Sequence, residues 1–197
     1  MDQLLQGSKA WLAFNVSQTD IPKLAETALK AGCKRVILTT TLPPQRINDT
    51  VIPEFDDAIK LFSTAGGAFT GIRHGEIVAG DEDFPYEIVN ATVPCLEATV
   101  ERGVLARVVA ELLRVEQSHN QQCGVCSSSE FAAAYLNILR SSGLTRTQEV
   151  YKMFTGGLQR VARLTVNEYE AQRKKAEEKK VLAEQREVIT FIFHFII

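Results

Sequence analysis

The most constraining feature of this sequence is a regular alternation between short β-type runs and amphipathic helical stretches. The clearest run is Arg35–Thr41, where apolar and β-branched residues follow one another as they do in parallel strands covered on both faces. A shorter run, Ala10–Val16, precedes it. Between the two, Thr19-Asp20 is an expected helix N-cap, and apolar residues recur at helical spacing as far as a C-cap at Gly32. This order predicts a β-α-β unit.

The alternation continues for about 140 residues and predicts an α/β fold with a parallel sheet flanked by helices. The amphipathic stripe between Glu101 and Glu116 is the clearest helix signal. The other expected elements are a helix at 54–65, a strand at 68–73, a turn at His74-Gly75, an acidic loop at 81–85, a strand at Tyr86–Val93, a strand at 122–126, and a helix capped by Ser127–Ser129 that ends near Arg140.

Residues 144–187 are expected to form a C-terminal helical extension. Thr145 and Gln148 have capping-box spacing at its start, and its end, Glu168–Glu187, mixes six Lys/Arg with six Asp/Glu. This pattern is typical of a solvated helix, and a partner-binding coiled coil is the alternative.

The last segment, Val188–Ile197, is an apolar tail of a different character. It is about half as long as a membrane-spanning helix, so we expect no membrane span. Its β-propensity makes it an aggregation hazard if it is exposed. We interpret it either as an altered end of the reading frame or as a strand that must be covered.

The charge composition excludes two classes of partner. The 197 residues contain 22 Lys+Arg and 24 Asp+Glu, with both signs mixed along the chain, so there is no electrostatic footprint for nucleic acid or an anionic membrane. Four scattered cysteines favour a reducing compartment over a disulfide-stapled scaffold. The segment Met1–Ala13 lacks the features of a signal or transit peptide, so the chain as written is expected to be cytoplasmic.

The middle of the chain carries a family resemblance. One expected strand ends in Thr39–Thr41, a helix closes on Ser63–Gly67, and the next strand ends in Arg73-His74-Gly75. This succession resembles the second half of the atypical short-chain dehydrogenases of the NAD(P)-binding, NmrA-like type, whose strand ends in a Thr-x-x-Arg-Pro-Gly-like stretch. His74 stands where proline is usual. With residues 101–113, which look like the family's late helix, the resemblance covers about Ala10 to Tyr135.

The glycine-rich part of such a fold is not found in the sequence. A dinucleotide site needs a glycine-rich turn after the first strand, and the chain contains no Gly-x-Gly-x-x-Gly. If Ala10–Val16 corresponds to the family's fourth strand, three strands lie upstream of Met1. We therefore expect residues 1–143 to form a Rossmann-like, NAD(P)-binding-type domain that is incomplete at its N-terminus.

An incomplete domain of this kind has consequences for its edge and its cofactor. The sheet would have a long unpaired edge, which a longer form of the protein or a protein partner would cover. The resemblance implies NADP or NAD as the cofactor, held weakly or only in a longer form. A longer precursor would also be compatible with a plastid location, which the resemblance permits.

Two groups of residues are candidates for cofactor binding. Thr39, Thr40 and Thr41 resemble the family's hydroxyl residues near the nicotinamide, and strand packing is the alternative explanation for them. Arg73, His74 and Gly75 stand at a strand's carboxyl end, the edge where open α/β sheets bind ligands. A plain strand-to-loop turn is the alternative there.

No catalytic residue or metal ligand is predicted. A carbonyl-reducing enzyme of this type needs a Tyr with a Lys four residues later, and none of the four tyrosines has one. Phe55 and Lys60 stand where that dyad belongs, at the wrong spacing. Cys123-Gly-Val-Cys126 has no second cysteine pair for a zinc site, so we expect buried structural thiols.

These observations favour an NAD(P)-binding-fold protein that has become a non-catalytic binding, regulatory or assembly factor. One alternative is an NAD(P)H-dependent oxidoreductase whose N-terminal half is missing. Another is a structural subunit of a larger complex, in which a protein partner covers the sheet edge and the charged C-terminal helix makes contacts. A glycine-rich turn upstream would favour the oxidoreductase, and co-purification with large assemblies would favour the subunit.

Overall fold

A computed structural model describes residues 10–42, 51–91, 99–127 and 130–161. The chain divides into two compact units, residues 1–159 and 160–197, and nearly all described residues belong to the first. The charged end at 168–187 and the apolar tail at 188–197 lie outside the described residues. The predicted division at residue 143 stays a prediction.

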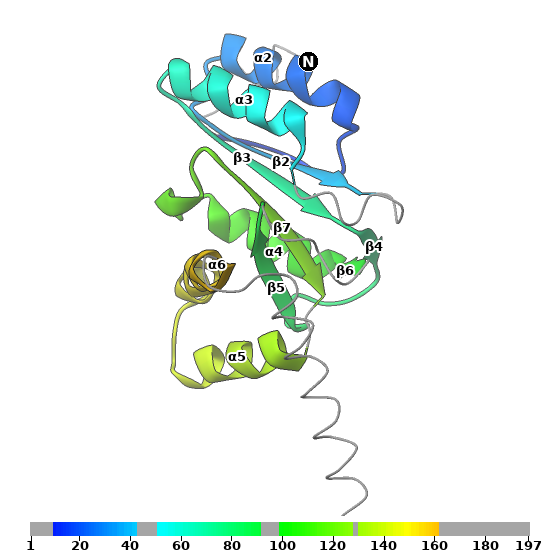
Figure 1. Ribbon diagram of the computed structural model, residues 1–197, viewed down its shortest axis with the longest axis vertical. Coiled ribbons are helices and arrows are strands. Elements are labelled where there is room, and N and C mark those ends of the chain that lie inside the picture. Colours follow the sequence, from blue (N-terminus) through cyan, green and yellow to red (C-terminus); the bar gives the residue numbers. More distant parts are fainter. Residues whose placement is uncertain (1–9, 43–50, 92–98, 128–129, 162–197) are drawn as a thin grey trace, which may run out of the picture. The chain divides into compact units, whose positions relative to one another are not determined.

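The first unit is built on a five-stranded sheet with the strand order β1-β2-β3-β7-β5 (Figure 1). Four strands run parallel, and β5 pairs antiparallel with β7. A second, two-stranded parallel sheet joins β4 and β6. The predicted α/β fold is confirmed, with a sheet that is mostly parallel. The strands are β1 (Ala10–Ala13), β2 (Arg35–Thr41), β3 (Ala68–His74), β4 (Glu76–Val78), β5 (Tyr86–Asn90), β6 (Thr99–Glu101) and β7 (Gln121–Ser127).

The direction of β5 departs from the expected parallel arrangement. Two parallel strands need a crossover connection between them, usually a helix. The chain instead leaves the carboxyl end of β3, passes through β4 and the acidic loop, and enters β5 from the same edge of the sheet. β5 therefore runs opposite to its neighbour β7. It ends at Asn90, short of the predicted Val93.

Helices cover both faces of the sheet (Figure 1). On one face, α2 and α3 pack against β1, β2 and β3. On the other face, α4, α5 and α6 pack against β2, β3, β5 and β7. This doubly covered arrangement accounts for the continuous apolar run of β2. The helices are α2 (Ile21–Lys30), α3 (Pro53–Thr64), α4 (Arg102–Leu112), α5 (Glu130–Ser141) and α6 (Arg146–Val161), with short 3-10 turns η1 (Gln18–Asp20) and η3 (Glu116–Ser118).

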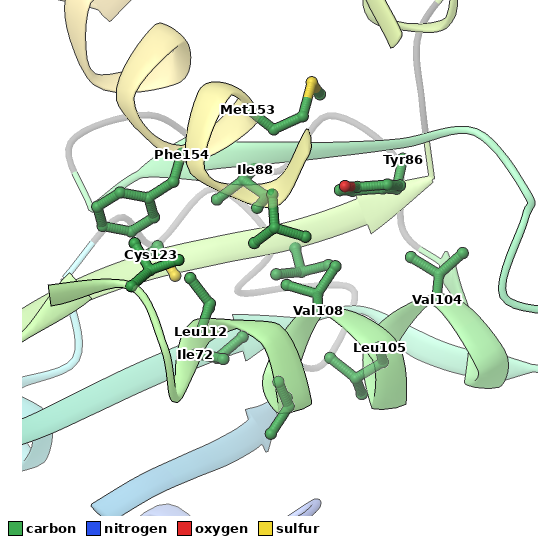
Figure 2. Close-up of a cluster of buried hydrophobic side chains, with 14 of the residues drawn as sticks. Ile72, Tyr86, Ile88, Val104, Leu105, Val108, Leu112, Cys123, Met153 and Phe154 are labelled. Atoms are coloured by element: carbon green, nitrogen blue, oxygen red, sulfur yellow. The ribbon is translucent and has the colours of Figure 1, made fainter. Parts of the chain in front are cut away.

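Each face of the sheet has its own apolar core. Figure 2 shows Val108 and Leu112 of α4 and Phe154 of α6 gathered with Ile88 and Cys123 of the sheet, all of them buried. Removal of this apolar surface from water is the main favourable term that holds the helices to the sheet.

The core on the α2–α3 face contains three aromatic rings. Phe55 and Phe62 lie tilted against Phe69, with ring centroids 5.9 and 5.7 Å away. Gly71 permits this packing, because a Cβ at that position would lie 2.4 Å from the Phe55 ring. The glycine in β3 is therefore required by close packing against α3.

Local signals at helix ends were predicted with mixed success. Thr145 and Gln148 form the predicted capping box, with reciprocal backbone-to-side-chain hydrogen bonds of 2.9 and 3.3 Å. Gly32 ends its helix with a φ of +80°, where glycine is favoured. Asp20 is the N-cap residue of α2, as predicted for Thr19-Asp20, but its side chain makes no capping hydrogen bond. Ser127 ends β7, and residues 128–129 lie outside the described residues.

β1 forms one end of the sheet and pairs, among the described residues, with β2 alone. The expectation that a protein partner covers this edge stays a prediction. Across the same described ranges, no helix combines the length and apolar character needed to cross a membrane.

Candidate functional site

The two predicted cofactor-binding groups lie side by side at the carboxyl edge of the sheet. In the parallel register of β2 and β3, Thr40 is opposite Arg73 and Thr41 is opposite His74. Carboxyl ends of parallel strands meet at one edge, which is where open α/β sheets bind ligands. His74 was expected in a turn, but it is the last residue of β3 and continues the pairing with β2.

Thr39 and His74 form a buried hydrogen-bonded pair. The backbone N–H of Asn15 donates to Thr39 Oγ1 at 2.9 Å, and Thr39 Oγ1 lies 3.2 Å from His74 Nε2. His74 Nδ1 lies 2.7 Å from the carbonyl oxygen of Gly75, which can only accept. The imidazole therefore carries its proton on Nδ1, and Thr39 donates to Nε2.

Burial sets the charge of this imidazole. His74 is fully buried, and loss of hydration lowers its pKa below the usual value of 6.5, although the hydrogen bond to Gly75 opposes the shift. A neutral ring with both nitrogens satisfied has no remaining atom to offer a ligand. The geometry thus assigns Thr39 and His74 to fastening β3 and β2 to the turn after β1.

The neighbouring predicted residues are also used within the fold. Thr40 donates to the carbonyl oxygen of Val16 at 2.7 Å. Arg73 is 1% exposed and donates from Nη2 to the carbonyl oxygen of Asn90 at 3.0 Å, so its side chain crosses β7 to reach β5. Gly75 is buried. The side chains of Thr40 and Arg73 therefore bond to the backbone within the fold and support the strands that form this edge.

The accessible groups at this edge are different ones. Thr41 is half-buried and donates to Asn15 Oδ1, and Phe14 beside them is 46% exposed. Asn15 has a φ of 52°, a left-handed conformation that asparagine tolerates better than most residues. Sequence analysis missed Phe14 and Asn15. Both lie inside the strand predicted at Ala10–Val16, whereas β1 ends at Ala13. The available signal was the asparagine within that run, because asparagine is common in turns that require such backbone angles.

A second polar cluster lies at the far end of the same edge. Tyr86 begins β5 and pairs with Ser127 at the carboxyl end of β7. Its hydroxyl donates to Glu149 Oε1 at 3.0 Å. Burial, followed by the negative charge of Glu149, raises the pKa of Tyr86 above its ordinary value. A proton-donating catalytic tyrosine needs the opposite shift.

The thiols and acids of the described residues show no metal site. Cys123 and Cys126 are buried, as predicted; Cys33 is buried as well, and burial raises its pKa. Ser127, in the predicted capping run, donates instead to both oxygens of the buried Glu101 at 3.2 Å. No group of three or more His, Cys, Asp or Glu side chains in the described parts could hold a metal ion.

The buried histidine makes stability depend on pH. The folded-state pKa of His74 lies below the unfolded value of about 6.5, so only the unfolded chain takes up this proton when the pH first falls below 6.5. We expect the contribution of His74 to the free energy of unfolding to be constant above about pH 6.5. Below that pH it should fall by at most about 1.4 kcal/mol per pH unit, and it should level off once the folded form also takes up the proton.

Urea denaturation at pH values from about 7.5 to about 5 measures this dependence. His74→Gln should show a shallower loss of stability than the unmodified chain. Both chains should carry His119→Gln, because burial and Arg35 lower the pKa of this more exposed histidine as well and it would otherwise contribute to the same pH dependence. Equal pH profiles for His74→Gln and the unmodified chain would contradict the assignment.

Comparisons with known proteins place the fold but give no close relative. No family model and no curated protein matches the sequence. A solved short-chain dehydrogenase/reductase (wide type) from Veillonella parvula, in complex with NADP, is similar with a TM-score of 0.51 and 14% identity, covering 65% of this chain and 67% of that one. An ethylated short-chain dehydrogenase/reductase from the same organism gives a TM-score of 0.50 and 14% identity, covering 65% and 66%.

These matches show the class of fold. The chain spans about two thirds of the length of the two Veillonella structures. Its architecture is a Rossmann-like α/β fold, similar to that of the two Veillonella structures. The expectation that three further strands lie upstream of Met1 is not confirmed and stays a prediction.

Proposed function

We propose that this protein binds NADP or NAD weakly at the carboxyl edge of β1 and β2, and that it acts as a non-catalytic binding, regulatory or assembly factor. The observation that supports the proposal is the difference between the buried and the accessible residues at this edge. Thr39 and His74 are buried and hydrogen-bonded to each other, whereas Phe14, Asn15 and Thr41 are accessible.

The accessible residues fit part of a nucleotide. An exposed aromatic ring offers a stacking surface for a base, and the Asn15 amide and Thr41 hydroxyl offer hydrogen-bonding groups beside it. The glycine-rich turn that holds a pyrophosphate on a helix N-terminus is not found in the sequence. A ligand held without those pyrophosphate contacts is expected to bind weakly.

The non-catalytic part of the proposal is supported by the tyrosines. Tyr86 is held by Glu149 with a raised pKa, and no tyrosine of the sequence has a lysine four residues later. Hydride transfer to a carbonyl needs an acidic proton donor beside the cofactor. The alternative of an NAD(P)H-dependent oxidoreductase would require that donor to come from elsewhere.

The test is a titration of the chain with NADPH and with NADH, followed by quenching of Trp11. This single tryptophan lies on β1, close to Phe14 in the sequence. We expect saturable quenching with a Kd below about 100 μM, roughly −5.5 kcal/mol. Thr41→Val, which removes only the hydroxyl, and Asn15→Gly, which keeps the left-handed turn, should each weaken binding by about fivefold.

Gln121→Val is the matched control, because Gln121 is exposed at the amino end of β7, away from the proposed site. Its affinity should equal that of the unmodified chain. A folded chain without saturable quenching, or equal affinities for all four proteins, would contradict nucleotide binding at this edge. Steady consumption of NADPH with added aldehydes or ketones would contradict the non-catalytic role and favour the oxidoreductase.

A further inference from the structure

Three side chains from three elements converge on the carboxylate of Glu149 in α6. Arg107 of α4 donates from Nη2 to Oε1 at 3.0 Å, and the Tyr86 hydroxyl donates to the same oxygen at 3.0 Å. Arg140 of α5 donates from Nε to Oε2 at 3.2 Å. Glu149 is 5% exposed, so this carboxylate is held in the interior by two guanidinium groups and a phenol.

The donors of this cluster exceed its acceptors. Arg107 Nε and Arg140 Nη2 are buried and have no hydrogen-bond partner. Asp83 adds its carboxylate to Arg107 and its backbone carbonyl to Arg140, but the Asp83 side chain is 69% exposed. The buried guanidinium of Arg107 and the partly exposed one of Arg140 therefore face a single buried carboxylate, and such an excess attracts anionic oxygen.

The cluster lies at a ligand-binding position of the fold. Tyr86 opens β5 at the carboxyl edge of the sheet, because it is paired with Ser127, the last residue of β7. β5 and β1 are at opposite ends of the strand order, so this cluster is distinct from the proposed nucleotide edge. The Arg107 guanidinium lies over the Tyr86 ring, 5.1 Å from its centroid, and this contact holds it in place in advance of binding.

We propose that Arg107, Arg140 and Tyr86 form a carboxylate-binding site that the chain fills with its own Glu149. A carboxylate is favoured over a phosphate because each arginine engages a different oxygen of one planar group. Glu149 is in this view a built-in ligand that blocks the site while α6 is in place. The site would accept the carboxylate of a small organic acid when Glu149 is withdrawn.

The experiment empties the site and offers a free carboxylate. In Glu149→Ala, sodium acetate should raise the thermal midpoint saturably, by about 3–6 °C at ten times its Kd, with sodium chloride used to keep the ionic strength constant. The unmodified chain should not respond, because its tethered carboxylate outcompetes a free one. Phosphate should give a smaller shift than acetate.

Two further variants test whether the acetate response comes from this cluster. Arg107→Gln in the Glu149→Ala background should abolish the acetate response. Thr147→Ala combined with Glu149→Ala is the control, because Thr147 lies on the same turn of α6 but bonds to Glu111, outside the cluster. It should keep the response. No saturable acetate effect in a folded Glu149→Ala chain would overturn the proposal.

Where Glu149→Ala does not fold in chloride, recovery of folding replaces the thermal midpoint as the measured quantity. Acetate should then restore the near-ultraviolet circular dichroism of the folded chain, and chloride at equal ionic strength should not. Failure of both salts to restore folding, or equal recovery in both, would overturn the site. A phosphate response that exceeds the acetate response would overturn the assignment to carboxylates.

Discussion

Replacing Phe55 with alanine is expected to lower the free energy of unfolding by about 3–5 kcal/mol, the usual range for loss of a buried aromatic ring. Phe55 is 1% exposed and fills the space above Gly71, where it also contacts Phe69. The truncation therefore removes apolar burial and leaves a cavity between α3 and β3. Urea denaturation of both chains measures the loss directly.

Gly71 makes this prediction specific to the observed packing. A methyl group at position 71 would lie 2.4 Å from ring atoms of Phe55, so Gly71→Ala alone should cost about 1–3 kcal/mol by overpacking. In the Phe55→Ala background, the same methyl group enters the cavity and should cost nothing or stabilise. Additive losses in the double variant would mean that the ring and the glycine are not in contact.

Local sequence signals were sufficient for most of the fold. Arg35–Thr41 coincides with β2 because an uninterrupted β-branched run has few alternatives in a sheet covered on both faces. The stripe of α4 and the capping box at Thr145 are likewise patterns within a few residues of one another. Such signals do not contain strand direction. β5 is antiparallel because of the path taken after β3, which no local pattern records.

The candidate site was predictable in place but not in accessibility. The carboxyl-edge rule placed Arg73, His74 and Gly75 at this edge, and the register of β2 and β3 places Thr41 opposite His74. Whether a side chain at that edge faces a ligand or the interior depends on the turn after β1. There, the left-handed Asn15 directs its backbone N–H to Thr39 and its side chain to Thr41. Three segments far apart in the sequence set this outcome.

The Glu149 cluster was not predicted, for a related reason. Glu149 is 42 residues from Arg107 and 63 from Tyr86, and its neighbours in the sequence predict only an amphipathic helix. A charged residue beside an apolar stripe is ordinarily solvated. Its burial follows from the packing of α6 against the same core that holds α4, through residues such as Phe154.

The second large effect is expected from Glu149→Leu. This change removes the buried negative partner of two arginines and puts an apolar side chain of similar size in its place, which leaves Arg107 only the exposed carboxylate of Asp83. It should cost about 3–5 kcal/mol and lower the thermal midpoint by about 6 °C or more. Most of the loss comes from the Arg107 guanidinium, whose side chain is 4% exposed, whereas Arg140 at 27% can turn toward water. Thermal and urea unfolding measure it.

The double variant Glu149→Leu with Arg107→Met decides what the cluster contributes. If the cost arises from an uncompensated buried charge, removal of that charge should recover most of the stability, because apolar groups of similar volume replace buried ion pairs at little cost. A double variant less stable than Glu149→Leu would instead locate the cost in packing. Leucine also occupies the space that alanine leaves open, so Glu149→Leu should not respond to acetate even though both arginines remain. A carboxylate site requires this difference between leucine and alanine, and a general effect of acetate on stability would not produce it.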